Sequence, residues 1–204
     1  MQHPRLSIII PILNQKQHLR NAIESVINQD FTDYELIIID GKSTDNSLDV
    51  IKEYENKISY WESSKDKNVY DAMNKGISKT NGDWLYFLGA DDKICEGTFQ
   101  NIFSKRLEDA NLILGNIIYQ NNEEFKGEYS NSLFLKNSIH HQGVVYHKRC
   151  FYGRSFSTSY SILADYDLNI QLFLEQKKAL YFNIDFAICG NAGISKQKGW
   201  THYK

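Results

Sequence analysis

Long hydrophobic runs are missing from this chain. A helix that crosses a bilayer needs about 20 consecutive apolar residues, and no segment of the sequence approaches that length. Residues 1–5 carry no signal-peptide pattern either, because the apolar run that follows them is only as long as a strand. The sequence therefore predicts a soluble protein, or one attached at most to a membrane surface.

Cysteine is scarce, and neither sign of charge is in excess. The three cysteines, Cys95, Cys150 and Cys189, are widely spaced and odd in number. They form neither a metal-ligand spacing nor a disulfide framework, which is typical of a reducing compartment. Lys and Arg total 23 against 25 Asp and Glu, a net charge of -2, so we expect no nucleic-acid partner.

Glycine is absent from Pro11–Gln17, the segment at the end of the first apolar run. A Rossmann oxidoreductase requires G-x-G-x-x-G there. A nucleotidyltransferase requires a basic, glycine-rich loop that holds a triphosphate, and this segment has only a single lysine. The second class stays open as an alternative, because it would share the architecture and the metal-binding carboxylates described below.

Residues 1–92 contain two kinds of apolar pattern that alternate. Short runs rich in β-branched or aromatic residues predict buried strands at 6–13, 34–39, 58–61 and 83–88. Apolar residues at helical spacing predict helices at 17–28, after a Ser43-Thr44-Asp45 cap, and at 69–79. This β-α-β-α-β-α-β order predicts a parallel sheet with helices on both faces.

The pattern is looser beyond residue 93. It predicts helices at 97–107 and 162–175, strands at 112–119, 143–147 and 179–188, and a polar hairpin or loop at 121–131. A length of 204 residues with 42% hydrophobic side chains suits a single α/β domain, or two fused halves that share a sheet.

Polar residues stand where the predicted strands end, at Asn14, at Asp40 and at the Asp91-Asp92 pair. The carboxyl ends of parallel strands form the binding edge of such a sheet. Two adjacent carboxylates there repel each other unless a cation or donor is present, and hard divalent ions bind carboxylates together with nucleotide phosphates. Asp91 and Asp92 are therefore predicted to hold a metal-nucleotide, with Gly89 leaving room for close approach to the backbone. A plain acidic or capping turn is the alternative for the pair, and a turn role is the alternative for Asp40.

Five sequence blocks, in this order, resemble the bacterial branch of the family 2 inverting glycosyltransferases, which have the GT-A fold. The blocks are LSIIIPILN (6–14), ELIIIDGKSTDNS (35–47), KDKNVYDAMNKGISKTNGDWLYFLGADD (65–92), HHQGVVYHKR (140–149) and ADYDLNI (164–170). A strand that ends in ADD is a weak signal alone, but five blocks in the family's order form a strong one. The Asp-Ala-Met-Asn-Lys-Gly form at 71–76 matches one sub-branch.

The chain departs from the family pattern at three positions. Many members have arginine where Met73 stands. The sub-branch usually has glycine where Asn68 stands, which bears on the local turn geometry. Many members have glutamate where Ala164 stands, just before the residue that aligns with the general base.

The resemblance implies a Rossmann-like nucleotide-binding half with a mostly parallel sheet, residues 1–92, fused to a smaller acceptor-binding half, residues 93–204. Within the first half it implies a metal motif at Asp91-Asp92, with Asp92 the more direct ligand of Mg2+ or Mn2+. The nucleotide contacts that it implies are Pro11, Asn14, Asp40, Asp66, Asn74, Lys75 and Asp91.

In the second half, Asp165 aligns with the acidic residue that serves as the family's general base. His141 and Gln142 resemble the family's His-Gln pair beside the donor diphosphate or the acceptor, and a core or surface histidine is the alternative for His141. Asp167 is interpreted as a structural partner or an acceptor contact. Because the dipole of a helix favours anions in its first turn, capping is a further alternative for Asp165 or Asp167.

These features together imply a metal-dependent inverting glycosyltransferase that moves a sugar from a nucleotide-diphosphate donor, usually a UDP-sugar, to a hydroxyl of a glycan or lipid-linked acceptor. Surface polysaccharide synthesis, a cytoplasmic location and peripheral attachment to the inner face of the membrane are expectations from the family. A non-catalytic nucleotide-sugar-binding module is the alternative, and the presence of both the metal-ligand and the base residues favours the enzyme.

Overall fold

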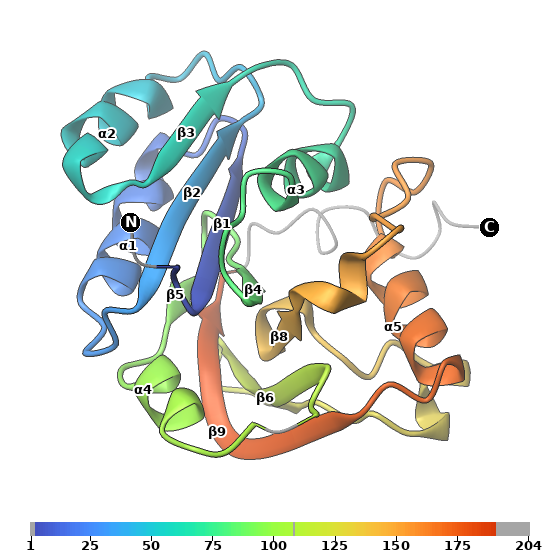
Figure 1. Ribbon diagram of the computed structural model, residues 1–204. Helices are drawn as coiled ribbons and strands as arrows, with labels where there is room; N and C mark the ends of the chain where they lie inside the picture. The colour runs from blue at the N-terminus through green and yellow to red at the C-terminus, as the bar shows by residue number, and fades with distance from the viewer. Residues whose placement is uncertain (1–2, 108, 191–204) are drawn as a thin grey trace.

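The computed structural model describes residues 3–107 and 109–190. Strands and helices alternate through the first half, as predicted (Figure 1). The third strand starts two residues later than predicted, because Ile58 follows a short 3-10 helix and packs into the core instead. The elements are β1 (Leu6–Ile12), α1 (Lys16–Ile27), β2 (Tyr34–Asp40), α2 (Ser47–Glu53), η1 (Glu55–Lys57), β3 (Tyr60–Ser63), α3 (Val69–Ile77) and β4 (Trp84–Phe87).

The second half contains shorter and less regular elements. The predicted helix at 97–107 covers only Thr98–Phe103, and the predicted hairpin at 121–131 is confirmed, because Glu124–Lys126 pairs back on β6. The elements are β5 (Lys93–Ile94), α4 (Thr98–Phe103), β6 (Leu112–Tyr119), β7 (Glu124–Lys126), η2 (Asn131–Phe134), η3 (His141–Gly143), β8 (Val144–His147), η4 (Lys148–Phe151), α5 (Ala164–Leu174) and β9 (Ala179–Cys189).

One mixed sheet runs through both halves in the order β3-β2-β1-β4-β8-β6-β9-β5, with β7 paired to β6. Strands β1 to β4 are parallel, which confirms the prediction for the first half. Strand β8 lies antiparallel between β4 and β6, and it is the seam where the second half joins the first. None of the helices in the described ranges is both long and apolar enough to span a bilayer.

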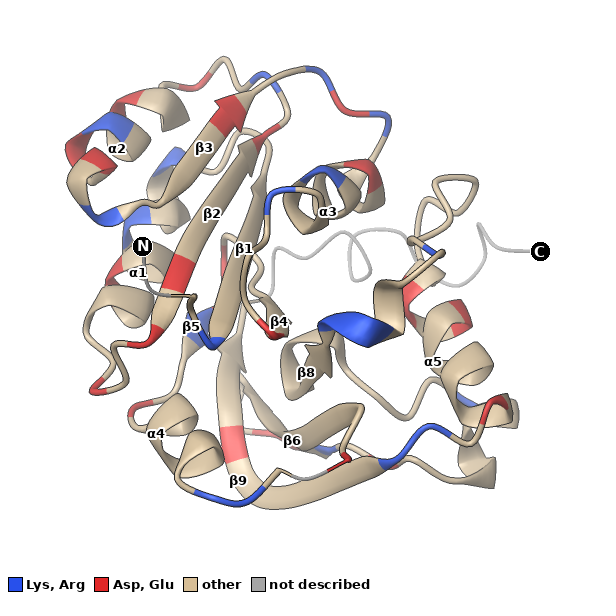
Figure 2. Ribbon diagram, in the orientation of Figure 1, with Lys and Arg blue, Asp and Glu red and all other residues tan. Residues whose placement is uncertain are grey.

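The two faces of the sheet are covered by different helices, because successive side chains of a strand point to opposite faces. Ile8 and Ile10 of β1 belong to a core cluster with α1, α2 and α4. Ile9 belongs to a second cluster with α3 and α5, on the other face (Figure 1). Helix α3 lies so close to β1 that any side chain at Gly76 would overlap Ile9. Figure 2 shows Lys, Arg, Asp and Glu interspersed over the helices and loops.

The strand order reverses between β1 and β4. Pairing of β1 with β4 ends at Ile9 and Phe87, whereas pairing of β1 with β2 continues to Ile12 and Asp40. Pro11, which has no N–H to donate, lies two residues beyond Ile9 on the side that β4 has left. In open α/β sheets, ligands bind at such a switch point, outside the carboxyl ends of the strands.

Candidate active site

Asp92 lies just after β4 with 4% of its surface exposed, and two N–H donors hold its carboxylate. Oδ1 accepts from the backbone N–H of Gly190 at 2.7 Å, and Oδ2 accepts from Nε2 of Gln142. A side chain at Gly89 would overlap Asp92 Oδ2. The room predicted at Gly89 is therefore used by the carboxylate of Asp92 itself.

This end of the sheet has an excess of negative charge and of hydrogen-bond acceptors. Burial, and then the neighbouring charge of Asp91, raises the pKa of Asp92 to about 7. Among the described residues, Asp91 Oδ2 and Gln142 Oε1 are buried without a hydrogen-bond partner. Buried polar atoms nearly always have a hydrogen-bond partner. The two unpartnered oxygen atoms are therefore suited to bind a cation.

The protein alone offers too few ligands for a closed metal cage. Within residues 3–107 and 109–190, no group of three or more His, Cys, Asp or Glu side chains is arranged to hold a metal ion. Mg2+ commonly binds one or two carboxylates and completes its shell with water and substrate phosphates. The Asp91-Asp92 pair fits that open arrangement, in which two carboxylates bind one side of the ion.

Asp165 lies in the first turn of α5 and is 7% exposed. Its Oδ1 accepts from the hydroxyl of Tyr70 at 2.8 Å, and its Oδ2 lies 3.6 Å from Nδ1 of His141. Asp167 points elsewhere, because residues two apart are about 200° apart around a helix, and its Oδ2 accepts from Gln171 Nε2 at 2.8 Å. Neither aspartate caps the helix, which begins after Leu163 without a side-chain cap.

The short helix η3 connects the two buried carboxylates. Gln142 donates to Asp92, and the preceding residue, His141, approaches Asp165. Burial lowers the pKa of His141 to about 4, so its imidazole is neutral at pH 7. The His-Gln pair predicted beside the donor or acceptor therefore lies between the candidate metal ligand and the candidate base.

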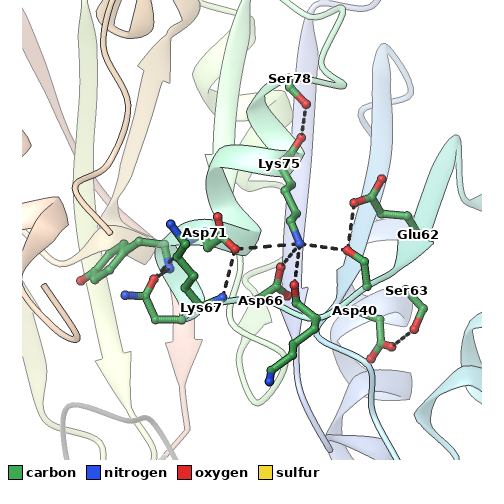
Figure 3. A network of polar contacts seen from close by, with 12 residues as sticks. Asp40, Glu62, Ser63, Asp66, Lys67, Asp71, Lys75 and Ser78 are labelled. Carbon is green, nitrogen blue, oxygen red and sulfur yellow. Dashed lines mark hydrogen bonds and ion pairs between the residues drawn. The ribbon is translucent and has the colours of Figure 1, made fainter. Parts of the chain in front are cut away.

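A second polar cluster lies between α3 and the loop after β3 (Figure 3). Nζ of Lys75 donates to Asp66 Oδ1 at 2.5 Å, to Ser64 Oγ at 2.9 Å and to the carbonyl of Lys65 at 3.1 Å. Burial raises the pKa of Asp66, and the bond to Asp66 raises the pKa of Lys75. A Cβ at Gly41 would lie 3.1 Å from Asp66 Oδ2, which places this ion pair at the end of β2.

Asp40 and Asn14 shape the loops at this edge. Asp40 is fully buried, and its carboxylate accepts from the N–H and hydroxyl of Ser43 and from Ser63 Oγ at 2.5 Å. Asn14 is in the left-handed region, with φ 53°, and its Oδ1 accepts from Thr44 N at 2.8 Å. The contact of Asp40 with the nucleobase of the donor stays a prediction. In the structure, the carboxylate of Asp40 accepts hydrogen bonds from Ser43 and Ser63.

Two asparagines, Asn68 at the N-cap of α3 and Asn74 within it, form hydrogen bonds with the segment 156–160 of the second half. Asn74 pairs with the backbone of Phe156 through both amide atoms, at 2.8 and 2.9 Å, and its nucleotide contact stays a prediction. Asn68 caps α3 by accepting from Tyr70 N and Asp71 N, and its Nδ2 donates to the carbonyls at 158 and 160. Its φ of -164° is ordinary extended backbone, so an asparagine at this position needs no strained turn.

Several of the predicted residues lie along one path of contacts, and Asp167 lies off it. The path runs from Asp92 through η3 to Asp165, and from Asp165 through Tyr70 into α3. From α3 it continues through Lys75 to the loop ends beside β2. Sequence reasoning missed Tyr70, although it stands inside a block that carries the family resemblance, just before the Asp-Ala-Met-Asn-Lys-Gly form.

Comparisons with known proteins show the family and the fold of the chain. The family model described as "Glycosyl transferase family 2" matches residues 7–200. A "PGL/p-HBAD biosynthesis glycosyltransferase" of Mycobacterium bovis is 35% identical over 183 residues, which are 85% of this chain and 71% of that protein. A Campylobacter jejuni "GalNAc(5)-diNAcBac-PP-undecaprenol beta-1,3-glucosyltransferase" is 29% identical over 139 residues, 66% of this chain and 45% of that protein.

Among solved structures, S. aureus TarS 1-349 in complex with UDP-GlcNAc has a TM-score of 0.81 at 16% sequence identity. The match covers 96% of this chain and 61% of that chain, so the likeness shows a shared fold. The chain spans less than two thirds of the length of this protein and of the Campylobacter relative.

Proposed function

Because the chain belongs to glycosyl transferase family 2 and has a GT-A-like fold, we propose that it transfers a sugar from a nucleotide diphosphate to an acceptor hydroxyl, with inversion. The observation that supports this most strongly is η3, whose adjacent residues His141 and Gln142 approach Asp165 and Asp92. A metal-diphosphate on one side and a proton acceptor on the other are the two groups that such a transfer needs.

The donor would bind across the carboxyl ends of β1, β2 and β4. Asp91 and Asp92 would hold Mg2+ or Mn2+, which when bound neutralises charge that develops on the leaving diphosphate. The buried, unpartnered Asp91 Oδ2 supports that fit. The fold neighbour was solved with UDP-GlcNAc, which makes UDP-sugars the first donors to test.

Asp165 would accept the proton of the acceptor hydroxyl. Among the described residues, Tyr70 occupies Oδ1 and Oδ2 has His141 at 3.6 Å as its neighbour, so Oδ2 is available for the incoming oxygen. The acceptor oxygen bonds to the anomeric carbon as the bond to the diphosphate oxygen breaks, and the proton moves to Asp165. One such displacement inverts the anomeric centre and needs no covalent intermediate.

The acceptor is proposed to be a glycan or a lipid-linked sugar of surface polysaccharide synthesis. The name of the Campylobacter relative contains a diphosphate-linked undecaprenol acceptor, which supports the lipid-linked class. Such an acceptor would place the protein in the cytoplasm at the inner face of the membrane.

Donor hydrolysis tests the proposal without knowledge of the acceptor, because water can take the acceptor's place. We expect one of a panel of UDP- and GDP-sugars to release its nucleotide in the presence of Mn2+. Asp165→Asn should lower turnover by about a hundredfold or more and leave the nucleotide-induced rise in melting temperature intact. The matched control is Asp49→Asn, an exposed first-turn aspartate of α2. Near-normal turnover of Asp165→Asn would contradict the base assignment.

A further inference from the structure

Asp165 receives a hydrogen bond that the reaction as described does not use. We propose that Tyr70 is a positioning residue, which holds the carboxylate of the base in one orientation for the incoming hydroxyl. This inference rests on the proposed function, since it assigns Asp165 the role of base. Its evidence is the contact between α3 and α5, two helices that come from different halves of the chain.

The contact is buried and well formed. Tyr70 is 6% exposed, and its hydroxyl donates to Asp165 Oδ1 at 2.8 Å. Burial and the charge of Asp165 raise the pKa of Tyr70 far above that of an ordinary phenol, although the N–H groups of Ala164 and Asp165 oppose the shift. The hydroxyl therefore stays protonated. A hydrogen bond from a neutral hydroxyl to a carboxylate is stronger than one between two neutral groups, and it fixes the direction of the oxygen that accepts it.

The hydroxyl of Tyr70, which donates this hydrogen bond, is also fixed in place before any substrate binds. Asn68 caps the first turn of α3, and Asn74 ties the next turn to the backbone of Phe156. The ring of Tyr70 packs against Phe156 with a centroid distance of 5.6 Å. A hydrogen-bond donor held this rigidly does not have to reorganise during the reaction.

The other titratable groups around Asp165 do not replace this bond. His141 is neutral and lies at 3.6 Å, and Tyr146 donates its hydroxyl to Asn169 Oδ1 at 2.9 Å. Within residues 3–107 and 109–190, Tyr70 is the group that hydrogen-bonds this carboxylate. The orientation of the Asp165 carboxylate should therefore depend on Tyr70 more than on any other described neighbour.

The test is the pH profile of donor hydrolysis by Tyr70→Phe, which removes one hydroxyl and keeps the ring. The acid limb of kcat should move up by about one to two pH units, because a hydrogen bond to a charged group is lost. Turnover at pH 7 should fall by about tenfold, while KM for the donor changes by less than about twofold. Tyr54→Phe is the matched control, since Tyr54 also donates to a carboxylate, Glu24 at 2.6 Å, but on the far side of the sheet. Its profile should equal that of the wild type.

Two further variants separate positioning from folding. In an Asp165→Asn background, Tyr70→Phe should have no additional effect on residual turnover, and an equal loss there would show a structural role and overturn the inference. Incorporation of 3-fluorotyrosine at position 70 keeps the ring and strengthens the donor, so the acid limb should move down. A wild-type acid limb in both Tyr70 variants, with Asp165→Asn inactive, overturns the inference alone. Full activity of Asp165→Asn overturns the proposed base and Tyr70's role with it.

Discussion

Two buried carboxylate sites lie at opposite ends of the parallel strands, and they are built differently. At the amino end, Glu35 of β2 accepts from Ser7 Oγ at 2.6 Å, from Asn81 N at 2.5 Å and from Gly82 N at 3.2 Å. At the carboxyl end, Asp91 Oδ2 is buried without a partner in the described chain. A buried carboxylate with a full set of donors is part of the scaffold, whereas one with unused lone pairs requires a ligand.

The largest effect should come from removing charge at the carboxyl end. Asp92→Asn should lower Mn2+-dependent donor hydrolysis by about a thousandfold, because the metal's contribution to catalysis is several kcal/mol. The folded protein should lose no stability, because burial and the like charge of Asp91 both disfavour the ionised carboxylate of Asp92. Nucleotide release with and without EDTA measures the first effect and urea unfolding the second. Metal-dependent turnover that survives the substitution would remove Asp92 from the site.

At the amino end, removing a carboxylate should lower stability and leave turnover unchanged. Glu35→Ala should lower the free energy of unfolding by about 3 kcal/mol, because it leaves the donors of Ser7, Asn81 and Gly82 without an acceptor. Turnover per folded molecule should not change. Urea unfolding measures the loss, and Glu123→Ala, at an exposed glutamate, is the control. A loss of turnover without a loss of stability would break the contrast between the two ends.

The raised pKa of Asp92 predicts that the free energy of unfolding of the metal-free protein depends on pH. The pKa of Asp92 is raised to about 7 in the folded state, and an aspartate in the unfolded chain titrates near 4. Between these values the folded protein keeps a proton that the unfolded chain releases. The free energy of unfolding should therefore fall by about 2 kcal/mol as the pH rises from 5 to 7 in EDTA.

Asp92→Asn serves as the control for this pH effect. Its urea-unfolding profile should lack the Asp92 contribution, so that the difference between the two proteins changes over that pH window. Mn2+ should also weaken the dependence in the wild type, because it binds the ionised carboxylate. Parallel profiles for the two proteins would show that Asp92 is not the titrating group.

Much of the scaffold follows from the sequence, because each long element buries residues at its own period. The bounds of β6, Leu112–Tyr119, agree with the prediction at both ends. β5 and η3 could not be predicted, since two or three residues carry no period. β5 is held by its pairing with β9. η3 is held at its start by the side chain of His140, which accepts from the backbone N–H of Gln142.

The candidate site divides in the same way. Asp92 is predicted from the end of a strand and from the family resemblance, and Asp165 from the resemblance. Both signals depend only on residue type and on position along the chain. The partners of these residues come from distant segments. Tyr70 lies 95 residues before Asp165, and Asn74 lies 82 residues before Phe156. No local pattern connects such pairs, so the hydrogen bonds that orient the site become visible only in the folded chain.

The smallest expected effect tests whether α3 belongs with the scaffold or with the site. Asn68→Gly removes the side chain at an extended φ that either residue adopts. The cap alone would cost a few tenths of a kcal/mol, but Nδ2 also donates to the carbonyls of Thr158 and Tyr160, each at 3.0 Å. We expect a loss of about 1 kcal/mol in urea unfolding. If Asn68 also keeps Tyr70 on Asp165, the acid limb of the pH profile should move in the direction seen for Tyr70→Phe. A stability loss with an unmoved profile would assign Asn68 to the scaffold, together with Glu35.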